Sequence, residues 1–70
     1  MTTLEIKSMI QNFVNGFGTG CSKEYMISKV HFFLRANDID NCILNDKYIE
    51  YNGCMIQLIR KRSECRWIVK

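Results

Sequence analysis

The amino-acid sequence predicts an α+β fold, in which two or three N-terminal helices pack on a C-terminal three-stranded antiparallel β-meander. Three observations indicate this class. Apolar residues recur with a helical period up to about residue 36, they alternate with a period of two from Lys47 onward, and an Asn52-Gly53 pair interrupts the alternating part. The chain has 70 residues, enough for a single small domain over residues 1–70, with a helical half to about residue 46 and a β half from about residue 47.

The first helix is expected from about Leu4 to Asn15. Thr2 stands three residues before Glu5, the spacing at which the two side chains cap each other's backbone N–H groups. Gly16, Gly18 and Gly20 are expected to end the helix, because glycine supplies the left-handed conformation that closes a helix. The apolar face consists of Ile6, Met9, Ile10, Phe13, Val14 and Phe17. The solvent face consists of Lys7, Ser8, Gln11 and Asn12.

A second helix is predicted from Ser22, as its N-cap, to about Ala36. Glu24 falls in the first turn and Arg35 in the last, where each charge complements the helix dipole. Its inward stripe consists of Met26, Ile27, Val30, Phe33 and Leu34.

The same helix carries a second apolar face. Tyr25 and Phe32 lie nearly opposite the inward stripe, with Lys29 between them. One interpretation is that the helix lies between the first helix and the sheet, so that both faces are buried. The alternative is a protein interface built on Tyr25, Lys29 and Phe32, either in a homodimer or with a larger protein.

Residues 38–46 connect the helices to the β half. Here we expect one short helical turn, capped by Asp38 or Asp40 and ended at Asn45-Asp46. The residues buried by this turn would be Ile39, Cys42 and Ile43.

Three strands follow, over about 48–51, 54–59 and 65–69. Asn52-Gly53 predicts the first reversal, because both residues tolerate positive φ, and a second reversal is expected near Arg62-Ser63. The register expected from these turns is Tyr51 opposite Cys54, Ile49 opposite Ile56, Leu58 opposite Trp67 and Ile56 opposite Val69. The inner face is then Ile49, Tyr51, Cys54, Ile56, Leu58, Cys65, Trp67 and Val69, and the outer face is Tyr48, Glu50, Met55, Gln57, Ile59, Lys61, Arg66, Ile68 and Lys70.

The charge of the chain is uneven, and this asymmetry suggests a function. Residues 47–70 carry six basic and two acidic side chains, a net charge of +4, whereas residues 1–46 carry a net charge of −1. We therefore expect a small regulatory module that binds nucleic acid through the C-terminal hairpin. The residues expected on phosphates are Arg60, Lys61, Arg62, Arg66 and Lys70, and those expected on a base are Tyr48 and Gln57.

The alternative function is a protein-binding inhibitor or adaptor, of the kind that phages and viruses encode. It would dock on a larger protein through the helix face or the outer sheet face. The basic hairpin would then be a solubilising surface or a protein contact.

Enzymatic and metal chemistry have little basis in the sequence. His31 is the only histidine, and no two of the four cysteines are as close as the ligand pair of a zinc knuckle. We expect free thiols, no catalytic residue, no metal and no cofactor. No apolar run approaches the length of a membrane span, and residues 1–7 lack the pattern of a secretory signal. The expected location is intracellular, cytoplasmic or nuclear, or host cytoplasm for a viral protein, with no membrane partner.

Helices followed by a β-hairpin whose last strand reads Cys65-Arg66-Trp67-Ile68 resemble a winged-helix domain. In Z-nucleic-acid-binding members of that class, a tryptophan of the final strand packs beside the recognition helix, and Trp67 matches that position. The chain departs from the pattern because it contains no proline, where these members carry a Pro-Pro pair before the tryptophan. The resemblance implies a winged-helix-like topology as the alternative fold.

Overall fold

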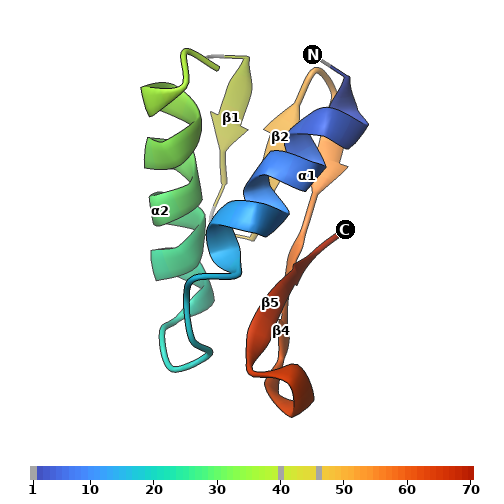
Figure 1. Ribbon diagram of the computed structural model, residues 1–70. Coiled ribbons are helices and arrows are strands. Elements are labelled where there is room, and N and C mark those ends of the chain that lie inside the picture. The colour runs from blue at the N-terminus through green and yellow to red at the C-terminus, as the bar shows by residue number, and fades with distance from the viewer. Residues whose placement is uncertain (1, 40, 46) are drawn as a thin grey trace.

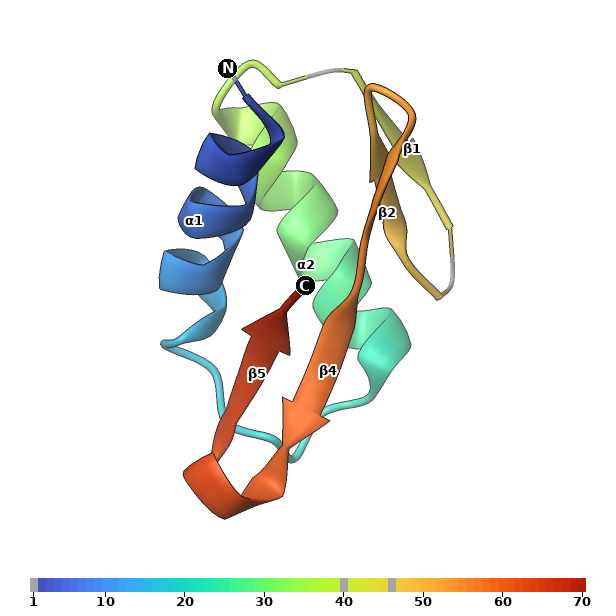
Figure 2. The same ribbon diagram turned by 90° about the vertical axis from the view of Figure 1, so that its right-hand side faces the viewer.

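The computed structural model describes residues 2–39, 41–45 and 47–70, and it has an α+β fold. The elements in chain order are α1 (Thr3–Val14), α2 (Lys23–Ala36), β1 (Cys42–Leu44), β2 (Ile49–Tyr51), β3 (Cys54–Ile56), β4 (Leu58–Lys61), the 3-10 turn η1 (Arg62–Glu64) and β5 (Arg66–Val69). The helix α1 packs against β5, and α2 packs against β1 and β4. The helices therefore form one layer and the strands the other (Figures 1 and 2).

The start of α1 confirms the predicted capping box. The Glu5 N–H donates to the Thr2 hydroxyl at 3.2 Å, and the Thr2 N–H donates to Glu5 Oε1 at 3.0 Å. The predicted left-handed glycine at the other end is wrong. Gly16, Gly18 and Gly20 do not have positive φ, and the helix ends at Asn15 in the right-handed region. Residues beyond it continue as tight turns, in which the Phe17 N–H donates to the Val14 carbonyl at 3.0 Å.

The helix α2 also begins as predicted, because the Ser22 hydroxyl accepts from the Tyr25 N–H at 3.1 Å. Its C-terminus is a Schellman motif. Asp38 has φ 61°, its N–H donates to the Arg35 carbonyl at 3.0 Å, and the Ile39 N–H donates to the Leu34 carbonyl at 2.9 Å. Asp38 thus ends α2 and does not cap a new helical turn.

The predicted helical turn over residues 38–46 is wrong, since this segment contains strand β1. Cys42 pairs with Tyr51 and Ile43 with Glu50, both antiparallel. Ile39 is buried as expected, but Ile43 is 61% exposed. The extended conformation of this segment is decided by its pairing with β2, which the local sequence does not reveal. The first strand therefore lies before residue 46, the predicted boundary between the helical half and the β half. Asp40 and Asp46 lie outside the described residues.

The predicted three-stranded meander is only partly matched. The hairpin of β2 and β3 has the expected register, closed by Asn52 with φ 50° and Gly53 with φ 80°. The strand that follows is interrupted at Gln57, so that the described strands form a three-stranded sheet (β1-β2-β3) and a two-stranded sheet (β4-β5). Gln57 and Lys70 still exchange two backbone hydrogen bonds of 2.8 and 2.9 Å, which extend the β4–β5 ladder by one pair.

The register expected between β4 and β5 is wrong by two residues. Leu58 pairs with Val69, not with Trp67, and Trp67 pairs with Arg60. The reason is the reversal, which uses η1 and then Cys65 with φ 53° before Lys61 meets Arg66. A shift of two keeps every side chain on its face, because strand side chains alternate with a period of two.

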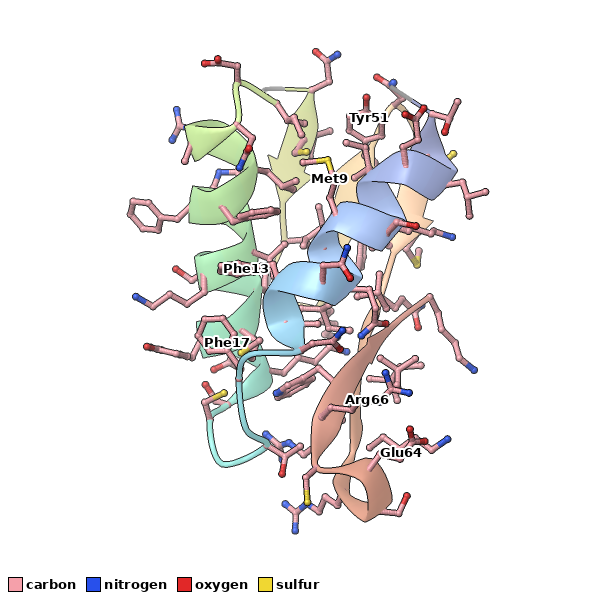
Figure 3. The ribbon with its side chains drawn as sticks, viewed as in Figure 1. Met9, Phe13, Phe17, Tyr51, Glu64 and Arg66 are labelled. Carbon is pink, nitrogen blue, oxygen red and sulfur yellow. The ribbon has the colours of Figure 1, made fainter. Side chains whose placement is uncertain are left out.

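The core lies between the helices and the sheets, and it confirms most of the predicted inner faces. Its buried residues are Ile6, Ile10, Val14, Met26, Ile27, Val30, Leu34, Ile39, Ile49, Tyr51, Ile56, Leu58 and Trp67. Cys54 and Cys65 were expected on the inner face, but both are exposed because they border the two reversals. Figure 3 shows Phe13 and Phe17 between α1 and α2, where Phe13 stacks on Phe33 with ring centroids 4.3 Å apart.

Two further expectations fail, one about the burial of α2 and one about the winged-helix alternative. Tyr25 is 48% and Phe32 is 72% exposed, so α2 is not buried on both faces. The chain that follows α2 forms β1 and β2. A recognition helix of a winged-helix domain would have to end there, and the structure does not support that alternative topology.

Candidate nucleic-acid interface

The C-terminal hairpin of β4, η1 and β5 concentrates basic residues at one end of the molecule. Residues 57–70 carry five basic side chains and one acidic side chain, Glu64. Lys61 and Arg66 form the last cross-strand pair before the reversal, so their side chains are direct neighbours on one face. Figure 3 shows Glu64 and Arg66 close together at this end, on the side of the hairpin away from α2.

Glu64 bridges the two neighbouring cations. Lys61 Nζ lies 2.7 Å from Glu64 Oε2, and Arg66 Nη2 lies 2.7 Å from Glu64 Oε1, which also accepts from Arg66 Nε at 3.0 Å. The 3-10 turn makes the first contact, because it brings residues three apart onto one side. The hydrogen bond from Lys61 and, to a lesser extent, those from Arg66 lower the pKa of the Glu64 carboxyl.

Arg62, in η1, and Lys70, directly after β5, are two further basic residues of the hairpin. Both side chains are exposed, and neither has an ion pair within residues 2–39, 41–45 and 47–70. Lys70 is paired through its backbone with Gln57, one of the two residues expected on a base. Of the predicted phosphate contacts, the structure therefore brings Lys61, Arg62 and Arg66 together at the tip and places Lys70 at the other end of the ladder.

Arg60 is different from the other basic residues. It shares its face with Leu58, its guanidinium lies 4.9 Å from the Trp67 ring, and Nη2 donates to the Cys21 carbonyl. Its Nε is buried and has no hydrogen-bond partner among the described atoms. The alternation of the strand thus turns Arg60 toward the loop after α1, where it joins that loop to the hairpin.

The two predicted base contacts lie near the junction of the sheets. Gln57 is exposed, and its Nε2 lies 3.1 Å from the Met55 sulfur. Tyr48 is half-buried and directly precedes β2, whose Ile49 pairs with Ile56, the residue before Gln57. These two side chains therefore belong to one end of the outer face, and the tip cations belong to the other.

The exposed face of α2 forms a second candidate surface, on the helix layer. Lys29 Nζ lies 5.3 Å from the centroid of the Tyr25 ring, within the range of a cation–π contact. Phe32 follows on the same face and is one of the most exposed large apolar residues described. A shallow open hollow of about 290 Å³ lies between the start of α2 and the hairpin, lined by Lys23, Leu58, Ile59, Arg60 and Trp67.

The side chains that carry metal or nucleophile chemistry lie apart. Within the described part of the chain, no three His, Cys, Asp or Glu side chains gather as a metal ligand set. In the described part of the chain, no disulfide links Cys21, Cys42, Cys54 or Cys65. His31 is half-buried, and its Nδ1 is buried without a hydrogen-bond partner in the described residues.

Sequence reasoning missed two polar residues that organise the hairpin. The sequence places Gln11 on the solvent face of the first helix. In the structure its side-chain amide forms hydrogen bonds with the backbone of β5. Glu64 was counted only as a charge, although its spacing of three residues from Lys61 in a turn was a signal for the ion pair.

In the described part of the chain, the helices are all too short or too polar to cross a membrane. Comparisons with protein-family models, with curated proteins and with solved structures each found no match.

Proposed function

We propose that this protein is a small non-enzymatic module that binds nucleic acid through the outer face of the β4–β5 hairpin. The observation that carries the proposal is the direct opposition of Lys61 and Arg66 across the ladder, with Arg62 on the adjoining turn. Like charges directly opposite each other destabilise a strand pair unless an anion lies between them, and in the free protein the Glu64 carboxylate is that anion. An arrangement of this kind is useful where the surface meets an anion.

Phosphodiester groups are the anions that fit this surface best. Guanidinium and ammonium groups donate several charge-assisted hydrogen bonds to phosphate oxygens. In the proposal Lys61, Arg62, Arg66 and Lys70 contact phosphates, and Gln57 and Tyr48 contact a base or a sugar at the other end of the face. Arg60 supports the hairpin from the inner side.

The proposal predicts a measurable salt dependence. Contacts with three or four phosphates correspond to a slope of about −2.7 to −3.6 for the logarithm of the binding constant against the logarithm of the salt concentration on duplex DNA, and about −2.1 to −2.8 on a single strand. Fluorescence anisotropy with labelled single-stranded and double-stranded oligonucleotides, from about 50 mM salt upward, measures both the affinity and the slope.

A matched pair of variants tests where the nucleic acid binds. Arg62→Glu changes the charge at the tip, and Lys29→Glu makes the same change on the exposed face of α2. We expect Arg62→Glu to weaken binding at least tenfold more than Lys29→Glu, because only Arg62 contacts phosphate. A tenfold loss is on the order expected for one lost charged contact. Equal losses in both variants, or no binding to either kind of oligonucleotide at low salt, would overturn the proposal.

A second candidate function uses the exposed face of α2. The observation that favours it is the exposure of Phe32 (72%) and Tyr25 (48%) next to Lys29 on one helix face. Aromatic and basic residues at helical spacing fit an apolar groove rimmed by carboxylates on a partner protein.

This second candidate is tested with Phe32→Ser and with Leu4→Ser as the control, because Leu4 is exposed to a similar degree, 75%, on α1. We expect a partner protein that recognises α2 to bind the wild type and Leu4→Ser but not Phe32→Ser. A concentration-dependent increase in mass of the purified protein, lost in Phe32→Ser only, would instead identify a second copy as the partner. Equal behaviour of the two variants would overturn the candidate.

A further inference from the structure

The hairpin tip contains two cations that are already arranged around one oxyanion. We propose that Lys61 and Arg66 form the seat for a single backbone phosphate, and that Glu64 occupies this seat in the free protein until a phosphate replaces its carboxylate. This inference rests on the proposed function and names the group that regulates the same surface.

The geometry of the seat comes from the three side chains. Each carboxylate oxygen of Glu64 is taken by a different cation, Oε2 by Lys61 Nζ and Oε1 by the Arg66 guanidinium, both at 2.7 Å. Arg66 donates from both Nε and Nη2, at 3.0 and 2.7 Å. Two adjacent oxygens of a phosphodiester can accept from the same donors, because Arg and Lys bind carboxylate and phosphate oxygens with the same charge-assisted hydrogen bonds.

The exchange requires no change of the fold. The Glu64 side chain is 38% exposed, and those of Lys61 and Arg66 are 52% and 41% exposed, so all three groups are reached from solvent. The turn is closed by its own backbone, since the Cys65 N–H donates to the Arg62 carbonyl at 3.1 Å. Release of the Glu64 carboxylate therefore leaves Lys61 and Arg66 opposite each other on their paired strands.

Glu64 distinguishes this seat from the remaining basic residues of the surface. Arg62 and Lys70 have no ion pair among the described residues, and they can meet phosphate without displacing a carboxylate. The free protein thus offers two open cations and one occupied seat. A nucleic acid that contacts only Arg62 and Lys70 leaves the Glu64 carboxylate between Lys61 and Arg66. Tight binding displaces this carboxylate.

The test compares Glu64→Gln with Glu50→Gln. Glu50 lies on β2 between Ile43 and Met55, and it has no ion pair in the described part of the chain, so its neutralisation removes the same charge without freeing a cation. We expect Glu64→Gln to tighten oligonucleotide binding about tenfold at low salt, and Glu50→Gln to change it by less than about threefold. In a Lys61→Met, Arg66→Met background, Glu64→Gln should lose its advantage over Glu50→Gln.

A second readout follows the carboxylate itself. In the free protein the pKa of Glu64 is lowered by Lys61 and Arg66. Exchange removes both donors and puts a phosphate nearby, so the pKa should rise when a saturating oligonucleotide is added, as followed by carbon-13 NMR of the side-chain carboxyl. Inorganic phosphate at the same ionic strength should leave it unchanged.

The outcomes separate the inference from the proposed function. If neither the wild type nor any of the variants binds an oligonucleotide, both the inference and the proposed function are overturned. Binding with equal effects of Glu64→Gln and Glu50→Gln, or with a Glu64 pKa that stays low in the complex, overturns the seat and leaves the proposed function standing. A pKa that rises with inorganic phosphate alone assigns the seat to free phosphate and overturns the inference for nucleic acid.

Discussion

The side-chain amide of Gln11, on α1, pairs with the outer edge of β5 on either side of Ile68. Gln11 Nε2 donates to the Trp67 carbonyl at 2.9 Å, and its Oε1 accepts from the Val69 N–H at 2.9 Å. Because β5 is an edge strand of its two-stranded sheet, these are backbone groups that no described strand satisfies. One helical residue therefore covers the edge and joins the helix layer to the proposed binding hairpin.

Gln11→Ala should lower the free energy of unfolding by about 1–3 kcal/mol, because two part-buried backbone groups lose their partner. Urea denaturation measures the change. Asn12→Ala is the control, since Asn12 is the next residue of α1 and is exposed. A loss no larger than that of Asn12→Ala would show that water replaces the Gln11 amide at little cost.

Arg60→Met should lower the free energy of unfolding by about 2 kcal/mol while leaving the salt dependence of oligonucleotide binding unchanged. The variant loses the hydrogen bond to the Cys21 carbonyl and the contact with the Trp67 ring. Arg62→Met should make the salt dependence of binding shallower and change the free energy of unfolding by no more than about 0.5 kcal/mol. A shallower salt slope for Arg60→Met, with unchanged stability, would place its guanidinium on the outer face.

Gly53→Ala should lower the free energy of unfolding by about 1–2 kcal/mol, because a side chain at φ 80° is strained even where space is available. Gly18→Ala is the matched control. A Cβ there meets no atom within 4 Å, and the φ of Gly18 is not in the left-handed region. Thermal denaturation should shift for Gly53→Ala only, and equal shifts would contradict the assigned turn.

The capping box predicts a dependence of stability on pH. Hydrogen bonds from the Thr2 backbone N–H and, to a lesser extent, from the Thr2 hydroxyl lower the pKa of Glu5 below its usual value. A carboxyl whose pKa is lower in the folded state stabilises the protein above its unfolded pKa, and this contribution is lost as pH falls through the folded value.

The melting temperature should therefore fall less between pH 7 and about pH 3 in Glu5→Gln than in the wild type, because glutamine keeps a capping acceptor without titrating. Glu24→Gln, in the first turn of α2, makes the same charge change outside the capping box. If the two variants follow the wild type equally, the Glu5 contact does not contribute to the acid dependence.

Local patterns were sufficient for the parts of the fold that depend on neighbouring residues. Thr2 and Glu5 start α1, Ser22 starts α2, and Asn52-Gly53 closes its hairpin, because each of these contacts spans two to four residues. The alternation of the C-terminal third likewise sorted most side chains correctly between core and solvent. That sorting survives a register error of two residues, since the period of a strand is two.

Long-range contacts account for what the sequence does not reveal by itself. Cys42–Leu44 is a strand because it meets β2, and Gln11 is part-buried because β5 needs a cover for its edge. Within the candidate site, the net charge of the hairpin could be read from composition, but its distribution could not. The reversal sets Lys61 opposite Arg66 and directs Arg60 toward Trp67, and these partners become neighbours only when the chain has folded.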